Sequence, residues 1–186
     1  MQVVAEREQL PVADARAGNA EAWKTLFRRY RLPLYVYGFE LLRDEQASLD
    51  LVQETFINAF RHIGSLRDDE KFGGWLFRIA HQKCVQQWRR QGREAELREE
   101  LLPELEADSP GPLDMLLREE REAEFMKLVE KLPLAQRSAL LLHYIEEFSL
   151  EEIAVITGTQ VGTVKSRLHY AKLALRKLLE LEEDRT

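Results

Sequence analysis

Near its C-terminal end the chain reads Ser149-Leu-Glu-Glu-Ile-Ala-Val-Ile-Thr-Gly158, followed by Thr159-Gln-Val-Gly-Thr-Val-Lys-Ser-Arg-Leu168. Ser149, with Glu152 three residues later, forms a capping box and predicts the start of a helix. Gly158 permits the left-handed turn that ends such a helix. A second helix is predicted directly afterwards, because four apolar residues recur at helical spacing: Val164, Leu168, Ala171 and Leu175. This pattern is typical of a helix-turn-helix, whose second helix lies in the major groove of DNA.

The second predicted helix is basic on its exposed side. Between Thr163 and Lys177 it carries five Lys or Arg residues and no Asp or Glu. Positions 162, 165, 166 and 169 lie opposite the apolar stripe and would face base edges, whereas 167, 172 and 176 are better placed for phosphates. The alternative is a solvated basic face on a structural helical hairpin. The candidate residues for duplex DNA are Gly162, Thr163, Lys165, Ser166, Arg167, His169, Tyr170 and Lys172.

Composition indicates a helix-rich globular protein, with 45% hydrophobic and 32% charged residues but only nine Gly and six Pro. The single cysteine, Cys84, excludes an intramolecular disulfide and a multi-cysteine zinc site, and we expect no metal or cofactor. The net charge of −6 is unevenly spread, because residues 93–124 carry −8 and the remainder carries +2. Charges act locally, over a Debye length of about 8 Å, so the overall acidity does not exclude DNA binding.

The periodicity predicts an all-α fold with two small helical domains, at residues 11–92 and 113–180. Helical spacing recurs in both segments, and no alternating apolar pattern favours a sheet. The segment between them, 93–112, is acidic and ends in Ala-Asp-Ser-Pro-Gly-Pro, which is typical of a flexible linker. The longest uncharged apolar run, 32–39, is far shorter than the roughly 20 residues of a membrane span. We therefore expect a cytoplasmic protein without membrane insertion.

Two features of the first domain suggest binding surfaces. The predicted helix around residues 49–60 divides into an inward face of Leu49, Val52, Phe56 and Phe60, and an outward face of Asp50, Gln53, Glu54 and Asn58. Further along, aromatic residues stand beside bases, and no acid interrupts residues 81–93. Rings for unstacked bases beside cations for the backbone are typical of single-stranded DNA binding. The alternative is that Trp75, Phe77 and Trp88 belong to the core.

Three segments carry a family resemblance: DLVQETF at 50–56, WLFRIA at 75–80 and VGTVKSRL at 161–168. In this order and spacing they resemble the extracytoplasmic-function sigma factors, the small two-domain sigma subunits of bacterial RNA polymerase. The resemblance covers residues from about 11 to 180. It implies that 11–92 is region 2, which binds the polymerase core and recognises and melts the −10 element. It also implies that 113–180 is region 4, which reads the −35 element as duplex.

The resemblance assigns roles and partners as well. It implies that Asp50, Gln53, Glu54 and Asn58 dock on the core, whose clamp helices and flap belong to its large subunits. The linker would thread the polymerase near its active site. Promoter DNA, duplex and single-stranded, and an anti-sigma factor are the other implied partners. The segment from about residue 66 onward would read the −10 element, with the candidates Arg67, Lys71, Phe72, Trp75, Arg78, His81, Gln82, Lys83, Arg89 and Arg90.

Departures from the family pattern affect specificity. His81-Gln82 stands where the family often has Arg-Asn, and Thr159-Gln160 replaces a frequent Ile-Pro, so the promoter preference does not transfer. The main alternative is a one-component regulator, a helix-turn-helix with a sensing or dimerising domain, which leaves the 50–56 and 75–80 motifs unexplained. An enzyme has little support, since no Gly-rich phosphate loop or nucleophile–base pair stands out.

Overall fold

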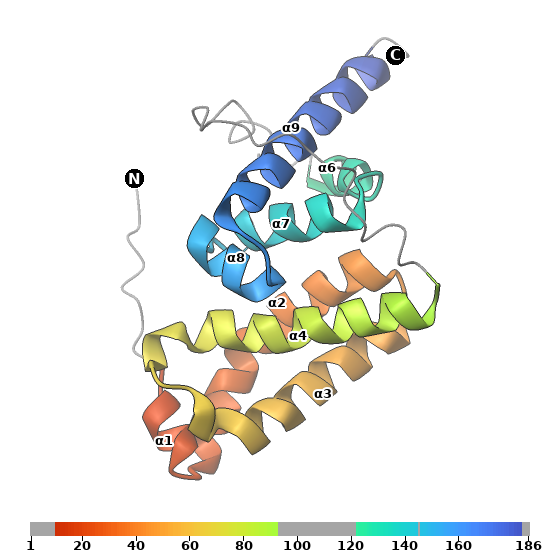
Figure 1. Cartoon of the computed structure of the whole chain (residues 1–186). Coiled ribbons are helices and arrows are strands. Elements are labelled where there is room, and N and C mark those ends of the chain that lie inside the picture. Colours follow the sequence, from red (N-terminus) through yellow and green to blue (C-terminus); the bar gives the residue numbers. More distant parts are fainter. Residues whose placement is uncertain (1–9, 93–121, 145, 184–186) are drawn as a thin grey trace, which may run out of the picture.

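The computed structural model describes residues 10–92, 122–144 and 146–183, and within these ranges every regular element is a helix (Figure 1). The all-α expectation is therefore confirmed for the described residues. The predicted linker, 93–112, lies outside them. The proposed domain limits of 11–92 and 113–180 stay predictions.

The first domain contains α1 (Val12–Arg16), α2 (Ala20–Leu42), α3 (Glu45–His62), the 3-10 turns η1 (Ile63–Ser65) and η2 (Asp69–Lys71), and α4 (Phe72–Arg90). Short polar side chains start the long helices. The Asn19 side chain accepts from the backbone N–H groups of Glu21 and Ala22, at the N-terminus of α2. Asp44 accepts from the Ala47 N–H at 2.8 Å and caps α3. Such caps satisfy N–H groups that have no partner within the helix.

The core of this domain is formed where α2 meets α3 and α4. Phe77 and Trp88 of α4 are fully buried, and the Trp88 indole N–H donates to the Leu41 carbonyl at 3.3 Å. Close approach of α2 to α3 depends on Gly38, because a Cβ there would lie 2.6 Å from Cδ2 of Leu51. These contacts set the angle at which α3 and α4 present their outer faces.

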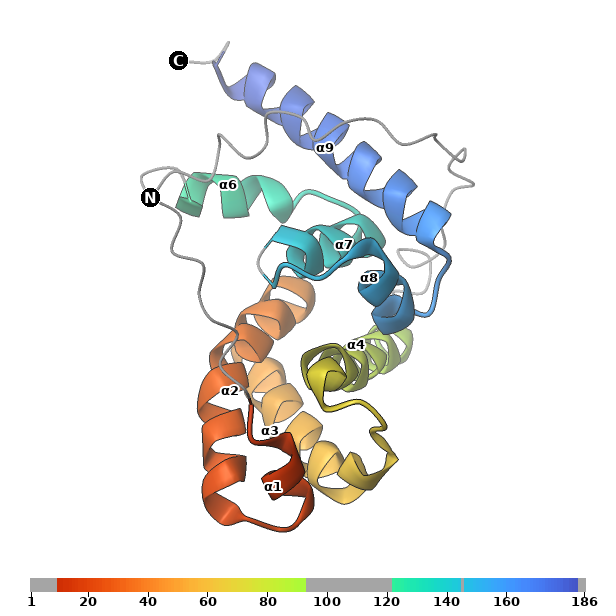
Figure 2. The ribbon, with the colours of Figure 1, turned by 90° about the vertical axis from the view of Figure 1, so that its left-hand side faces the viewer.

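The second domain contains α6 (Glu122–Val129), α7 (Leu134–Tyr144), α8 (Leu150–Thr157) and α9 (Val161–Glu183). The predicted apolar stripe of α9, from Val164 to Leu175, is buried against α7 and α8. Figure 2 shows α9 extending well beyond the short α8. The stripe therefore fixes which sides of α9 can face a ligand.

The two domains pack against each other. In both views α8 lies on α4, and α7 lies beside the C-terminal half of α2 (Figures 1 and 2). The sequence suggested two separately folded bodies on a tether and gave no sign of this contact. The packed arrangement decides which of the predicted binding residues are accessible.

Candidate nucleic-acid interface

The helix-turn-helix predicted from the sequence is present. The Ser149 Oγ accepts from the Glu152 N–H at 3.2 Å, and the Glu152 carboxylate accepts from the Ser149 N–H at 2.9 Å. Gly158 ends α8 at a φ of 67°, in the left-handed region where glycine carries no steric penalty. The capping box and the glycine turn are thus confirmed, and they fix where α8 begins and ends.

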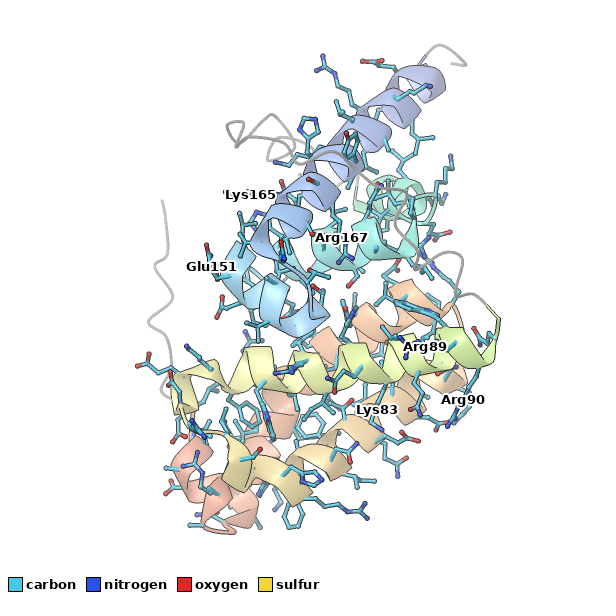
Figure 3. All side chains as sticks on the ribbon, in the orientation of Figure 1. Lys83, Arg89, Arg90, Glu151, Lys165 and Arg167 are labelled. Carbon is cyan, nitrogen blue, oxygen red and sulfur yellow. The ribbon has the colours of Figure 1, made fainter. Side chains whose placement is uncertain are left out.

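The first turns of α9 hold the residues predicted to read duplex DNA. Lys165 is exposed, and Figure 3 shows it leaving α9 on a different side from Arg167. Lys172 places its ammonium 5.7 Å from the centre of the Tyr144 ring, a cation–π contact within the domain. Five of the predicted residues are half-buried: Gly162, Thr163, His169, Tyr170 and Lys172.

Two residues of α9 are less accessible than predicted. Ser166 is 3% exposed and Arg167 is 8% exposed, although the helical pattern placed Ser166 on an open face. Both residues already have interaction partners in the fold. The expected exposure of these two side chains is therefore wrong for this conformation, because other parts of the chain cover them.

The α4 helix and the loop before it carry the residues predicted for single-stranded DNA. Positions 71, 75, 78, 82 and 89 recur at intervals of four, three, four and seven, so they form one stripe along the helix. Trp75 in this stripe is half-buried, and its ring lies 5.9 Å from that of Phe72. The exposed members of the predicted set are Arg67, Lys71, Arg78, Gln82, Arg89 and Arg90.

Two members of that set lie inside the molecule instead. Phe72 is fully buried, with its ring 5.6 Å from Tyr30. Gly73 allows this packing, because a Cβ there would lie 2.9 Å from the Tyr30 hydroxyl. His81 is 8% exposed and its Nδ1 lies 2.8 Å from the Tyr37 hydroxyl. Their predicted exposure is wrong, because aromatic packing and the second domain occupy that side of α4.

His81 is also uncharged at neutral pH. Burial, with a smaller effect of the Arg167 charge, lowers the pKa of His81 to about 4. A neutral imidazole offers no charge to a phosphate. The sequence signal, a histidine in a basic helix, did not distinguish an internal hydrogen-bonding group from a DNA contact.

The outer face of α3 carries the predicted docking residues. Asp50, Gln53 and Glu54 are exposed and Asn58 is half-buried. Asp50 accepts from the Gln46 amide at 3.0 Å. Glu54 forms an ion pair of 2.6 Å with Lys83 of α4, and Lys83 is half-buried beside α3.

The apolar side of α3 differs from the predicted one. Leu49 is 49% exposed and Phe60 is 63% exposed, whereas both were expected to pack inward. Val52 is buried as expected and Phe56 is half-buried, and the other buried positions are Ser48, Leu51, Thr55 and Ala59. The expectation was wrong because helical spacing alone fitted two neighbouring stripes. The exposed Leu49, Ile57 and Phe60 therefore add an apolar component to the acidic face.

Comparison with known proteins identifies the two domains. The sigma-70 region 2 family matches residues 26–94, and the sigma-70 region 4 family matches residues 122–175. The chain is 30% identical to the ECF RNA polymerase sigma factor SigW of Bacillus subtilis, over 90% of this chain and 94% of the relative. It is 35% identical to the ECF RNA polymerase sigma-E factor of Escherichia coli, over 90% of this chain and 92% of the relative.

Solved structures agree with this grouping. CnrH in complex with the cytosolic domain of CnrY matches with a TM-score of 0.65 and 26% identity, over 91% of this chain and 95% of that chain. The sigma factor RpoE of Bartonella quintana, in complex with the anti-sigma factor NepR, matches with a TM-score of 0.65 and 29% identity. The match covers 87% of this chain and 98% of that chain.

A region 2 domain followed by a region 4 helix-turn-helix defines the class of two-domain sigma-70 proteins. Within that class, this chain belongs to the extracytoplasmic-function sigma factors, which direct RNA polymerase to promoters at transcription initiation. No helix in the described part of the chain has both the length and the apolar character that a membrane crossing requires.

Proposed function

We propose that the outer face of α3 binds the polymerase core, that α4 and the loop before it capture the −10 strand, and that the first turns of α9 read the −35 duplex. The observation that carries the proposal is the Glu54–Lys83 pair, at 2.6 Å. It joins the acidic and apolar face of α3 to α4, the helix that carries the basic and aromatic stripe. Docking and strand capture would then be performed by one rigid body.

The composition of the α3 face supports docking on a large protein. The exposed carboxylates of Asp50 and Glu54 steer a basic partner over distance, which speeds association. Phe60 and Ile57 supply the apolar area that gives an interface most of its affinity. Exposed apolar groups of this size beside charges are typical of protein interaction sites.

The stripe on α4 supports binding of a separated strand. Half-buried Trp75 is held by Phe72 and leaves part of its ring accessible for stacking, which contributes about 1–3 kcal/mol per base in single-strand binders. Arg78 and Lys71 lie in the same stripe and would contact the backbone. Bases that leave the duplex cost a few kcal/mol each to unstack, so a site that captures them favours promoter opening.

Region 4 would hold the neighbouring duplex. Lys165 is exposed in the second turn of α9, and the N-terminal residues of a recognition helix are the ones that reach base edges. The chain would supply no chemistry of its own and would act in the cytoplasm with the polymerase. Control by an anti-sigma factor is supported by two similar structures, of CnrH with CnrY and of RpoE with NepR.

Reconstituted transcription tests the proposal. Purified chain and core polymerase are incubated with a genomic promoter library, and the run-off transcripts are sequenced. We expect starts downstream of a shared pair of elements, and a stoichiometric complex with the core. Transcription that does not depend on the chain, or dimeric binding to a palindrome without polymerase, would instead support a one-component regulator.

A further inference from the structure

The loop before α4, residues 66–71, is held by a side chain from α1. Arg16 is the last residue of α1, and one of its guanidinium nitrogens donates to the Leu66 carbonyl at 3.1 Å and also to the Asp69 carboxylate. These partners are 50 and 53 positions away along the chain. In both views α1 and this loop lie at the same end of region 2 (Figures 1 and 2). One cation therefore joins α1 to two parts of the loop.

The short α1 helix is itself fixed on α2. Val12 is fully buried and Ala15 is 2% exposed, so one side of α1 belongs to the region 2 core. The indole N–H of Trp23, in the second turn of α2, donates to the Ala15 carbonyl at 2.9 Å. This bond lies one residue before Arg16. Because α1 is anchored there, the Arg16 side chain leaves from a defined position and can hold the loop in place.

Hydrogen bonds within the loop give it a local shape. The Leu66 N–H donates to the Ile63 carbonyl at 3.1 Å, and the Lys71 N–H donates to the Asp68 carbonyl at 3.1 Å. The Asp68 carboxylate also accepts from the Glu70 N–H at 3.1 Å. Each of these bonds joins residues at most three positions apart. The Arg16 contacts differ from them, because they reach out of the loop and tie it to another element.

The loop is acidic, although it is proposed to approach DNA. Its two bases are outnumbered by three acids, which leaves a charge of −1: Arg67 and Lys71 against Asp68, Asp69 and Glu70. The Lys71 ammonium lies 3.9 Å from the Asp68 carboxylate, so its charge is shared with that acid. Carboxylates within a Debye length of about 8 Å repel the phosphates of a DNA strand. The charge of Arg16 brings the balance of the loop to zero.

We propose that Arg16 is a positioning residue for the −10 strand: it fixes the 66–71 loop on α1 and neutralises Asp69, so that the loop can approach the DNA backbone. The role toward DNA rests on the proposed function of this loop, whereas the fixation on α1 does not. Both side chains of the ion pair are partly exposed, and such pairs contribute little to the stability of a fold. The pair therefore acts mainly on the shape and the charge of the loop.

Hydrogen exchange in the free full-length chain tests the fixation. Arg16→Met keeps the aliphatic stem and removes the donor, and exchange at the N–H groups of residues 66, 70 and 71 should become about fivefold faster. The matched control is Lys24→Met, which breaks a 2.6 Å surface ion pair with Glu21 inside α2 and should leave exchange in the loop unchanged. Unchanged exchange in Arg16→Met overturns the fixation. Circular dichroism verifies that each variant keeps its helices.

Promoter opening by the holoenzyme tests the charge effect. A fluorescent base analogue in the −10 element reports opening, which should be about fivefold slower with Arg16→Met than with the unmodified chain. The defect should grow as the salt concentration is lowered, because salt screens the repulsion by Asp69. Asp69→Asn added to Arg16→Met removes the uncompensated charge and should recover part of the opening rate, while exchange in the loop stays fast. A purely structural role of Arg16 predicts no recovery, and that result overturns the charge effect.

Two further variants separate this inference from the proposed function. Arg67→Ala and Lys71→Ala remove the exposed bases of the loop itself. If both leave promoter opening unchanged, the proposed function of the loop fails and the role of Arg16 toward DNA fails with it, although fast exchange in Arg16→Met would still show the fixation. If both slow opening and Arg16→Met does not, the loop captures the strand without help from Arg16, and the inference alone is overturned.

Discussion

The ammonium of Lys83 lies 2.6 Å from the carboxylate of Glu54, and this ion pair connects α4 to α3. Lys83 was predicted to contact DNA and Glu54 to contact polymerase. Their pairing means that each group is positioned by the other. Changes on the α3 face therefore fall into two kinds, those that alter only the docking charge and those that also alter the α3–α4 junction.

Charge reversal distinguishes these two kinds. Asp50→Lys should weaken core binding about tenfold, mainly through slower association that depends on salt, since exposed interface charges act chiefly on the on-rate. Glu54→Lys should do the same and also remove the pair with Lys83, which costs up to about 1 kcal/mol of stability. Association kinetics at two salt concentrations and chemical denaturation measure both effects. Asp14→Lys, on the exposed side of α1, is the charge-matched control, and equal affinity of all three would refute the docking face.

The close approach of α2 to α3 predicts an unusual glycine effect. Gly38→Ala should destabilise region 2 by about 1–3 kcal/mol, because the new Cβ would lie 2.6 Å from the buried end of Leu51. Helix propensity alone predicts a gain of about 1 kcal/mol. In Gly64→Ala the added Cβ meets no atom within 4 Å, so stability should stay level or rise slightly. Thermal unfolding measures the stability of both variants. Equal stability of Gly38→Ala and Gly64→Ala would contradict the close contact between Gly38 and Leu51.

A buried hydroxyl on α3 predicts a stabilising substitution. Thr55 is fully buried and its Oγ1 has no hydrogen-bond partner among the described residues. Thr55→Val keeps the shape, removes the unsatisfied group and should raise the free energy of unfolding by about 1 kcal/mol. Thr157→Val is the control, because the Thr157 hydroxyl donates to the Ile153 carbonyl at 2.7 Å. That control should lose stability, and a loss in both variants would mean that Thr55 has a partner.

The fold should lose stability in mild acid through His81. This side chain is surrounded by Tyr37 of α2, Ser138 of α7, Trp88 on its own helix and Arg167 of α9. Its pKa is about 4 in the folded chain and returns toward its ordinary value near 6.5 on unfolding. Protonation of His81 therefore favours unfolding. Its contribution to stability is fully present above about pH 6.5 and falls by up to about 1.4 kcal/mol per pH unit below it.

Chemical denaturation between about pH 7 and pH 5 measures this effect. His81→Gln should lose less stability than the unmodified chain as the pH is lowered, because only the histidine contribution is removed. Glu40 acts in the other direction, because burial raises its pKa and its protonation favours the folded state. Glu40→Gln isolates the histidine contribution. An equal loss of stability in the unmodified chain and in His81→Gln would contradict the role of His81.

Base reading by α9 predicts a sequence-dependent defect. Lys165→Ala should cost about 1–3 kcal/mol on the preferred −35 element and less on altered elements, if a base contact is lost. Arg176→Ala, on the exposed side of α9, should weaken binding to all sequences and lower the salt dependence. Reconstituted transcription on a set of −35 mutants compares the two. If Lys165→Ala weakens transcription equally on every −35 sequence, Lys165 contacts phosphates and not base edges.

Much of the local structure could be predicted from the sequence, because it depends on neighbours along the chain. The capping box of Ser149 and Glu152 and the turn at Gly158 involve residues within a few positions of each other. The buried stripe of α9 could be predicted from the helical spacing of its apolar residues. On α3 the same reasoning was wrong for Leu49 and Phe60, since the apolar residues fit two adjacent stripes and packing against α2 and α4 selected one.

The domain contact could not be predicted in this way. Tyr37 and Ser138 are 101 positions apart, and neither belongs to a recognisable motif. His81 and Ser166 lie in motifs that suggest DNA binding, and only the packed arrangement shows that both are covered. Long-range contacts between single polar residues leave no periodic trace in one sequence.

The position of Cys84 has a consequence for how the cell could control this protein. Its thiol is sealed in the core and stays protonated up to about pH 12, and it is the chain's only sulfhydryl group. Peroxides and electrophiles react with accessible thiolates. The folded chain therefore offers such reagents no accessible cysteine thiolate.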